Sequence, residues 1–373
     1  MIRLILLGLL SGAFFSSTFV LNELMSAAGG HWFWSASLRY VFMLLLLTAM
    51  IAIQHGVGRI GELWHIFRQH IGFWCITGSI GFGVFYTGIC YAGDHASGWV
   101  VAATFMFTVV TSLLVLLAFG QRFDKKFIVY ALIVFVGVVL VNISEGLHAP
   151  SDANTIPLTQ MLLYGALPAL IAAFSYPIGN QLVWQASYNS KQHKAKQSQA
   201  EQHGAEYQDN QSQPMRAETA LLASAHDSTA DEHVTTTAPA STLQTLIGRI
   251  PIIETDLLQN AFNKVWLMTV GSLPFWLVLG IFVRPELPGS AQIFNTLLVA
   301  LLSGVAATSL FLYAREQAVT SSEVAGVDST QASEIIFALI GGMILLGNPL
   351  PSAMGLFGIV LIIIGLILFA KDG

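Results

Sequence analysis

The sequence predicts an all-α membrane protein in which ten transmembrane helices form two inverted five-helix repeats, with both termini in the cytoplasm. The first observation is a series of apolar stretches about 17–25 residues long, the length that a helix needs to cross the hydrocarbon of a bilayer. The second is the composition, because 54% of the residues are hydrophobic and 10% are charged, whereas about a quarter are charged in a typical soluble domain. The third is the distribution of lysine and arginine, which indicates the orientation.

Lysine and arginine collect on one side of the predicted membrane. If the N-terminus is cytoplasmic, fourteen of the 16 Lys and Arg residues fall in cytoplasmic segments, as the positive-inside rule requires. The exceptions are Arg284, in a short outer turn, and Arg39, inside a predicted span. The cytoplasmic basic residues are dispersed over several short loops, a pattern that excludes nucleic acid as a partner.

The spans of the first repeat are expected at residues 3–22, 34–54, 71–92, 97–119 and 127–143. The apolar run of the first span is longer than the ~7–15 residues of a signal-peptide core, so we interpret it as a membrane helix. In the third span, glycines at positions 78, 81 and 83 allow a neighbouring helix to approach closely.

The spans of the second repeat are expected at residues 159–183, 264–283, 292–314, 322–346 and 353–370. Five crossings bring the chain to the opposite side of the membrane. The second repeat therefore starts from the other side and lies inverted relative to the first, as in membrane proteins built from internal repeats.

Three regions follow from these spans. Residues 1–184 hold repeat one (1–143) and the sixth span, and residues 263–373 hold the remaining helices of repeat two. Between them, residues 185–262 form a polar insertion rich in Gln, Ser, Ala, His, Thr and Glu, which its lysines place in the cytoplasm. Such a segment buries too little apolar surface to offset the entropy of folding, so we expect it to be disordered.

A carboxylate lies deep in the ninth predicted span. Each charge in a span costs about 2.5–3.5 kcal/mol on insertion scales, so it requires an explanation. Glu334 is ~18 Å along the helix axis, close to the bilayer midplane, and shares one helix face with Asp328 and Gln331. Burial favours the protonated form of a carboxyl group, so Glu334 is a candidate site for a proton or a cation. The alternative is an interhelical hydrogen bond.

The other charge inside a span is Arg39. Its expected partner is Glu23, which follows Asn22 at the outer end of the first span, because spans joined by a short loop tend to pack side by side. From this depth the arginine can also extend to the outer surface. A structural Arg39–Glu23 ion pair and an outer gate or carboxylate clamp are both consistent with the sequence.

The sixth span combines Tyr176, Pro177, Gly179 and Asn180. Proline removes a helix hydrogen bond and glycine permits a bend, so the freed carbonyl and Asn180 can line a cavity, whereas a hinge without ligand contact is equally consistent. Aromatic residues of the third and fourth spans are candidates for the wall of such a cavity. They are Tyr86, Tyr91, Trp99, Phe105 and Phe107.

Known catalytic motifs are missing from the sequence. We find no Walker lysine motif, no HExxH metal motif and no recognisable nucleophile triad, so no enzyme activity, metal or cofactor is expected. The two cysteines, Cys75 and Cys90, both lie in the third span and are interpreted as packing residues.

Four short segments carry a resemblance to a known family. They are Gly12–Val20 (GAFFSSTFV), Ser37-Leu38-Arg39-Tyr40, Gly120-Gln121-Arg122 and Ser333-Glu334-Ile335-Ile336-Phe337. In their order they resemble the ten-helix members of the drug/metabolite transporter superfamily, particularly the multidrug-efflux-like (EamA-type) branch. The resemblance covers all ten spans. The chain departs from the family where Gln121 replaces a glutamate and where no proline is found around Met106 and Phe107.

The resemblance implies a multi-pass protein of the cytoplasmic (inner) membrane that exports small organic molecules or metabolites by alternating access, with protons as the coupling ion. Its implied partners are the small-molecule substrate, protons and the lipid bilayer. Glu334 is then the protonatable residue, with Gln331 and Asn180 as polar contacts. An uptake carrier of the same fold, in which Arg39 binds an anionic group, is the first alternative, and a membrane protein without transport activity is the second.

Overall fold

The computed structural model describes residues 2–120, 124–148, 158–211, 248–253, 255–319 and 321–372. Throughout these ranges the regular elements are helices. The chain divides into two compact units, one formed by Met1–Val183 and Leu257–Gly373 and the other by Trp184–Asp256. Gln121 and Arg122 lie outside the described residues.

The helices of the first half of the chain are α1 (Ile2–Ala27), α2 (Trp32–His55), α3 (Gly58–Gln69), α4 (Ile71–Gly78), η1 (Ser79–Val84), α5 (Phe85–Gly93), α6 (Gly98–Phe105), α7 (Thr108–Ala118) and α8 (Lys126–His148). Those that follow are α9 (Leu158–Met161), η2 (Leu162–Ala166), α10 (Leu167–Gln211), η3 (Leu257–Gln259), α12 (Ala261–Val283), α13 (Ser290–Val299), η4 (Ala300–Ala307), α14 (Thr308–Glu316), α15 (Ser321–Ser329), η5 (Thr330–Ala332), α16 (Ser333–Leu346) and α17 (Ala353–Asp372).

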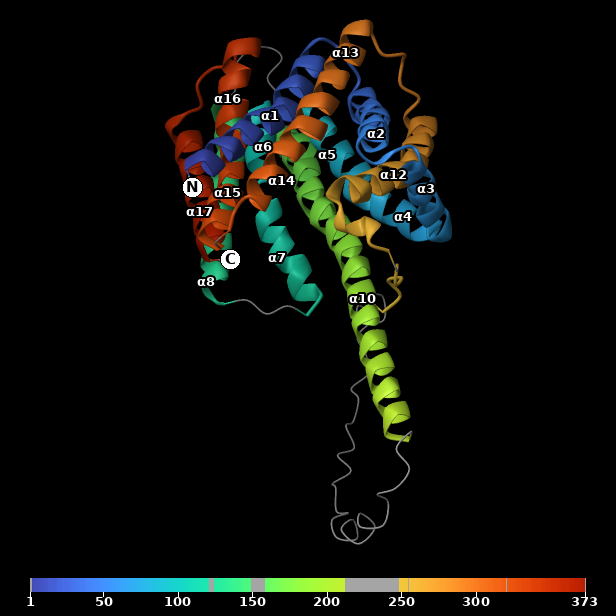
Figure 1. Ribbon diagram of the computed structural model, residues 1–373. Coiled ribbons are helices and arrows are strands. Elements are labelled where there is room, and N and C mark those ends of the chain that lie inside the picture. The colour runs from blue at the N-terminus through green and yellow to red at the C-terminus, as the bar shows by residue number, and fades with distance from the viewer. Residues whose placement is uncertain are drawn as a thin grey trace. The chain divides into compact units, whose positions relative to one another are not determined.

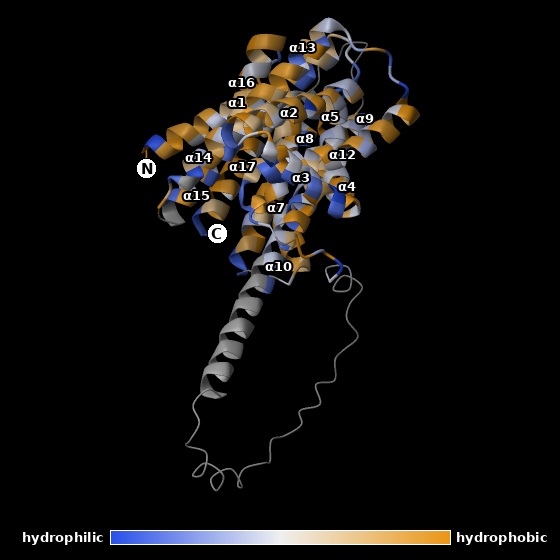
Figure 2. Cartoon of the chain, turned by 45° about the vertical axis from the view of Figure 1, so that its right-hand side comes forward, coloured by the Kyte–Doolittle hydropathy of each residue, from blue (hydrophilic) through white to orange (hydrophobic). Residues whose placement is uncertain are grey.

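The ten predicted spans are confirmed. Among the described residues, ten helical segments are long and apolar enough to cross a membrane. They run from Ile2–Ala27 to Ala353–Asp372, and each overlaps one predicted range. Many large apolar side chains of these helices point outward, for example Leu277 and Phe282 of α12, which are 70% and 80% exposed. Figure 2 shows hydrophobic residues over the outside of the spans, as a lipid environment requires.

The structure differs from the sequence prediction at the start of the polar insertion. Residues 185–211 continue α10 as a helix instead of an irregular segment. Their Gln, Lys, Ala and Glu residues have high helix propensity, so a helix that leaves the apolar region can extend through them without packing. The rest of the insertion up to residue 247 lies outside the described residues.

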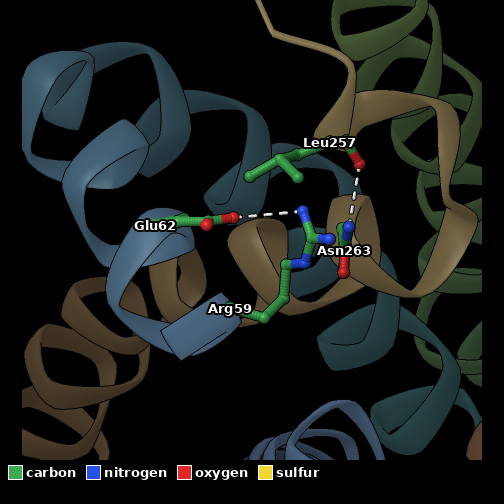
Figure 3. A network of polar contacts seen from close by, with 4 residues as sticks. All are labelled: Arg59, Glu62, Leu257 and Asn263. Atoms are coloured by element: carbon green, nitrogen blue, oxygen red, sulfur yellow. Dashed lines mark hydrogen bonds and ion pairs between the residues drawn. The ribbon is translucent and has the colours of Figure 1, made fainter. Parts of the chain in front are cut away.

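A short helix, α3, was not predicted. It occupies the connection between the second and third spans and buries Leu63, Ile66 and Phe67, an amphipathic spacing. On its polar side, Arg59 Nη1 lies 3.0 Å from Glu62 Oε2. Figure 3 shows this pair beside the start of α12, where Asn263 Nδ2 donates to the carbonyl of Leu257 at 2.9 Å.

The unit that contains the spans is held together by close helix crossings. In Figure 1, α1 lies beside α16 and α14, and α8 packs against α17. At the α8–α17 crossing, the α-carbon of Gly137 faces the backbone of Gly358, and a Cβ at either position would come within 2.8 Å of the other residue's carbonyl oxygen. Between α4 and α12, Gly78 and Gly271 meet the facing backbone in the same way. The glycines noted in the third span therefore mark real helix contacts.

Several spans depart from the α-helix at their middle. The third, sixth and eighth spans contain π-helical stretches, η1, η2 and η4, and each stretch includes at least one glycine. The fourth span is interrupted at Met106 and Phe107, between α6 and α7, and the ninth at η5, between α15 and α16. Such irregularities are common at functional sites because they redirect side chains and free backbone groups.

Pro177 lies within α10, which continues as a helix through it. A proline has no N–H for the carbonyl four residues earlier, which here belongs to Ala173. Thr111 of α7 donates its hydroxyl to this carbonyl and is fully buried. The predicted freed carbonyl therefore exists, but it is bonded to the fourth span instead of lining a cavity.

Replacing Gly271 by alanine is expected to lower the stability of the folded protein by about 1–3 kcal/mol, because the added methyl group overlaps the Trp74 carbonyl oxygen and the helices must separate. Thermal unfolding in detergent measures the effect. Gly72→Ala in α4 is the control, since nothing lies within 4 Å of a Cβ at that position. Equal melting temperatures for the two variants would contradict the close contact between α4 and α12 at Gly271.

Thr111→Val is expected to lower the free energy of unfolding by about 1–3 kcal/mol. The substitution preserves the shape of the side chain but leaves the Ala173 carbonyl buried without a donor. Ser112→Ala is the control, since Ser112 Oγ bonds to the Thr108 carbonyl of its own helix at 2.7 Å. Chemical denaturation in mixed micelles gives the comparison. If Ser112→Ala loses as much stability as Thr111→Val, the hydrogen bond between the fourth and sixth spans stabilises the fold no more than a bond within one helix.

Candidate functional site

The interruption of the ninth span places Glu334 at the start of α16. Ser329, Thr330 and Ser333 each donate a hydroxyl to the carbonyl three residues earlier, at 2.8, 2.6 and 2.6 Å. Such side-chain bonds compete with the regular helix pattern and favour the tight turn at η5. Glu334 follows directly, and its side chain is only 7% exposed.

The carboxyl group of Glu334 is not bonded to the described protein residues around it. In the part of the chain that the structure describes, its carboxyl group forms neither a hydrogen bond nor an ion pair. α16 packs against α1 and α6. On α1 the acidic residue is Glu23, and its carboxylate is already bonded elsewhere. Glu334 is therefore a buried carboxyl group without a protein partner, an arrangement that is costly when the group is charged.

Tyr176 of α10 lies near both charged residues in the interior. Its phenol interacts electrostatically with the Glu334 carboxyl and with the Arg39 guanidinium. Asn180, one turn later, donates to the Tyr176 carbonyl at 3.0 Å and so supports the same helix turn. A role of Tyr176 and Asn180 in binding a substrate or a proton stays a prediction.

Aromatic rings surround Tyr176. Its ring centre lies 5.0 Å from that of Phe85 and 6.0 Å from that of Phe105. Phe85 and Phe105 are themselves 5.3 Å apart, and Phe19 of α1 lies 6.3 Å from Phe105. Tyr176 remains 38% exposed, so these rings do not close completely over one another. The group combines residues of α1, α5, α6 and α10.

The predicted aromatic wall is formed in part. Phe105 belongs to the ring group, and Tyr86 is 5.8 Å from Phe85. Phe107 instead contacts Phe135 of α8, at 5.8 Å, and Tyr91 contacts His95 in the turn after α5, at 4.8 Å. Phe105 and Phe107 are two residues apart, a spacing that does not place side chains on one helix face.

Arg39 lies buried in the same interior. It is 8% exposed, and its Nη2 donates to Ser303 Oγ of η4 at 3.0 Å. Ser303 Oγ also accepts the Thr18 hydroxyl of α1 at 2.6 Å. The guanidinium carbon lies 4.0 Å from the centre of the Tyr86 ring, a cation–π contact. The Nε of Arg39 is buried without a partner.

Tyr86 is fixed from several sides. Asn22 Nδ2 donates to its hydroxyl at 3.2 Å, while Asn22 Oδ1 is buried without a partner. Tyr40 meets Tyr86 edge to face at 5.8 Å and stacks between Phe82 and Trp276. The ring beneath Arg39 is therefore held in place by α1, α2 and α12.

The predicted ion pair between Arg39 and Glu23 is wrong. Glu23 Oε2 accepts the backbone N–H of Gly98, and its Oε1 accepts Asn348 Nδ2, each at 2.7 Å. The prediction assumed that consecutive spans are neighbours, but α2 packs mainly against α12, α13 and α5. Arg39 thus faces the interior and does not extend outward. A gating role for Arg39, Glu23 and Asn22 stays a prediction.

Sequence reasoning missed the contacts that Glu23 and a second carboxylate make with the start of α6. Ser97 Oγ donates to Glu145 Oε1 of α8, one residue before the Gly98 amide that Glu23 binds. Two carboxylates, from α1 and α8, therefore hold the start of α6, and Asn348 adds the end of α16. Glu145 was overlooked because the fifth span was expected to end at residue 143, whereas α8 continues to His148.

Asp328 and Gln331 line a cleft of 890 Å³ between α7, α14, α15 and α17. Asp328 Oδ2 lies 3.3 Å from Arg315 Nη2, and its Oδ1 is buried without a partner. Glu334 is not among the cleft-lining residues. The predicted single face of Asp328, Gln331 and Glu334 is therefore divided by the turn at η5.

Gly179, predicted as part of a hinge, packs directly on Gly81 of η1, where a Cβ on either glycine would collide with the other backbone. Gly179 therefore permits a close contact between the third and sixth spans. A hinge motion at Pro177 and Gly179 stays a prediction.

Comparison with known proteins identifies the family. The family model described as "EmrE: Putative multidrug resistance efflux transporter" matches residues 2–372. The chain is 28% identical over 382 residues to "Uncharacterized protein YjlA" of Bacillus subtilis (strain 168), with 98% of this chain and 94% of that protein covered. It is 29% identical over 328 residues to "Uncharacterized 42.1 kDa protein in intracellular alkaline protease 3'region" of Shouchella clausii, with 84% of this chain and 65% of that protein covered.

A solved structure described as "Crystal structure of protein" shares the fold, with a TM-score of 0.50 and 12% identity over 98% of this chain and 95% of that one. The family match covers all ten spans, and it includes both Arg39 and Glu334. The resemblance inferred from the sequence motifs is thus confirmed, and the chain belongs to the family of EmrE-like putative multidrug resistance efflux transporters.

Proposed function

We propose that the protein is a secondary active transporter that exports small organic molecules across the cytoplasmic membrane in exchange for protons. The observation that carries this proposal is Glu334, a carboxyl group buried near the middle of a span without a protein partner. Ionisable groups at this depth cost several kcal/mol and mark ion or substrate pathways. In this proposal the substrate crosses the membrane unchanged, so the protein is not an enzyme.

Two inverted five-span repeats provide the machinery for alternating access. The positions of the helix irregularities support this arrangement. η1 in the third span has its counterpart in η4 of the eighth, and the interruption after α6 in the fourth span has its counterpart at η5 in the ninth. Each pair occupies the same place in its half of the chain. Rocking of one repeat against the other then exposes a site near the midplane to either side.

The present conformation corresponds, in this proposal, to the state open to the cytoplasm. The cleft that contains Asp328 and Gln331 is also lined by Phe127, Lys371 and Asp372, at the end of the unit where the positive-inside pattern places the cytoplasm. At the opposite end, Glu23 and Glu145 hold the start of α6.

Proton exchange at Glu334 links the two states. A carboxyl group surrounded by protein and aromatic rings is more easily accommodated when it is neutral, so it takes up a proton in the absence of a cationic partner. A cationic group of the substrate that reaches Glu334 replaces this proton. The proton and the substrate therefore compete for one carboxylate, which is the simplest mechanism for obligatory exchange.

Glu334→Gln is expected to fold and to reduce pH-gradient-driven flux by ~10-fold or more, because the amide keeps the shape of the side chain but cannot exchange a proton. Proteoliposomes with and without an imposed pH gradient measure this, with radiolabelled tetraphenylphosphonium and 4-(aminomethyl)benzoate as probes. Glu62→Gln, at an exposed acid of α3, is the matched control and is expected to behave as the wild type.

Accumulation in inside-out vesicles that requires an acidic interior supports export in exchange for protons. Accumulation in right-side-out vesicles that requires an acidic exterior would instead identify an uptake carrier. Undiminished gradient-driven flux in Glu334→Gln would overturn the proposed role of the carboxylate.

A further inference from the structure

The interior of the protein contains two opposite charges that do not neutralise each other. Arg39 and Glu334 are 8% and 7% exposed. Neither forms an ion pair within the part of the chain that the structure describes. A buried charge is ordinarily paired or removed by titration. Protonation removes the charge of Glu334 in the proposed exchange, but the charge of Arg39 cannot be removed in this way. A ligand with an anionic and a cationic group would pair with Arg39 and replace the proton of Glu334.

The Arg39 guanidinium is not fully hydrogen-bonded within the protein. A guanidinium carries five N–H donors in a flat fork that matches a carboxylate. One nitrogen donates to Ser303 Oγ, the Tyr86 ring covers one face, and Nε is buried without an acceptor. Arginine remains charged under all relevant conditions, so its missing counter-charge cannot be removed by titration.

The acid expected to neutralise Arg39 is not available. Both oxygens of Glu23 are bonded to Gly98 and Asn348, at the outer ends of α6 and α16. A cation–π contact and one neutral hydroxyl do not replace a counter-ion. The guanidinium is thus held rigidly by Ser303 and Tyr86 and is ready to accept an anionic group.

A chain of rings leads from Arg39 to Tyr176. Tyr86 lies beneath the guanidinium at 4.0 Å, Phe85 is 5.8 Å from Tyr86, and Tyr176 is 5.0 Å from Phe85. Tyr176 lies within electrostatic range of both Arg39 and Glu334. Arg39 and Glu334 form no ion pair, and aromatic rings line the interior around Tyr176, so we infer that a ligand that reaches both carries an apolar body between its own charged groups.

We propose that the protein binds organic zwitterions whose anionic and cationic groups are separated by an apolar body. The anionic group, a carboxylate in the simplest case, binds the free side of the Arg39 guanidinium. The ammonium group binds Glu334, and the apolar body lies against Phe85, Phe105 and Tyr176. This inference rests on the proposed transport function, because it names the class of substrate that the exchange site takes.

The alternatives each satisfy only one end of the site. A lipophilic cation replaces the proton of Glu334 but leaves Arg39 without an anion, and an organic anion pairs with Arg39 but leaves the proton on Glu334, so it does not drive the proposed exchange. An amino acid such as glycine carries both charges on adjacent atoms and cannot place them on opposite sides of the rings. The arrangement thus favours ligands that carry both charges and hold them apart.

Three ligands of nearly equal shape test the charge requirement on the wild-type protein. 4-(Aminomethyl)benzoate carries both charges on opposite sides of one ring, 4-methylbenzylamine carries the cation alone, and 4-methylbenzoate carries the anion alone. Isothermal titration in detergent is expected to give a Kd for the zwitterion that is lower by ~10-fold or more than that of either analogue. Equal or tighter binding of 4-methylbenzylamine, or no binding of the zwitterion, would overturn the inference.

A length series tests the separation. Glycine, 6-aminohexanoate and 8-aminooctanoate carry the same two groups at increasing distance, and 4-(aminomethyl)benzoate fixes that distance with a rigid ring. We expect the longer members to bind and glycine not to bind. Binding of glycine as tight as that of 6-aminohexanoate would contradict the placement of the two charges on opposite sides of the rings.

Variants assign the anion to Arg39. Arg39→Gln is expected to raise the Kd of 4-(aminomethyl)benzoate by ~10-fold or more and to leave that of 4-methylbenzylamine unchanged. Arg39→Lys, which keeps the charge, is expected to bind the zwitterion more tightly than Arg39→Gln does. Arg59→Gln, at an exposed arginine paired with Glu62 on α3, is the control and is expected to match the wild type. An equal loss for both ligands in Arg39→Gln would show that the arginine only supports the fold.

The two proposals fail in distinguishable ways. Ligand preference is measured in detergent without a gradient, so it does not depend on transport or proton coupling. Zwitterion preference together with gradient-independent flux would retain the binding site and reject proton exchange. Gradient-driven flux of tetraphenylphosphonium, together with equal binding of cation and zwitterion, would retain the exchange and reject the substrate class.

Discussion

The absence of a protein counter-ion for either of two buried ionisable groups is the constraint on which the interior of this protein depends. A single unpaired charge in a membrane span costs about 2.5–3.5 kcal/mol on insertion scales, and the packing around it must tolerate that cost. Here Arg39 is held over the Tyr86 ring by Ser303, and Glu334 sits at the start of a helix segment. A structural ion pair would have left neither group able to bind a ligand. Without one, Arg39 stays available to a ligand, and Glu334 to a ligand and a proton.

The fold around these groups departs locally from the regular helix. Hydroxyl groups of Ser329, Thr330 and Ser333 bend the ninth span just before Glu334. Glycines in the π-helical stretches let neighbouring spans touch backbone to backbone, as between Gly81 and Gly179. The carbonyl freed by Pro177 is bonded to Thr111, so that the helix that carries Tyr176 continues through the proline. These irregularities lie close to residues of the site, including Glu334 and Tyr176.

Much of the architecture could be predicted because hydropathy and charge sidedness act over whole spans. All ten predicted ranges overlap a helix of suitable length. Pairwise contacts could not be predicted. The Arg39–Glu23 pair assumed that neighbours in sequence are neighbours in space, whereas Arg39 contacts η4 and α5. The shared face of Asp328 and Glu334 assumed an uninterrupted helix. The helix over residues 185–211 was missed because composition reports burial and not local helix propensity.

Proton release on ligand binding tests the central claim most directly, because it reports whether the ligand and a proton share Glu334. Purified wild-type protein in weakly buffered detergent near pH 7 receives 4-(aminomethyl)benzoate, and a pH-indicator dye follows the solution. The account predicts release of protons by the wild type and no release by Glu334→Gln, although the variant still binds the anionic end at Arg39. Ligand binding to the wild type without proton release, or equal release by both proteins, would contradict it.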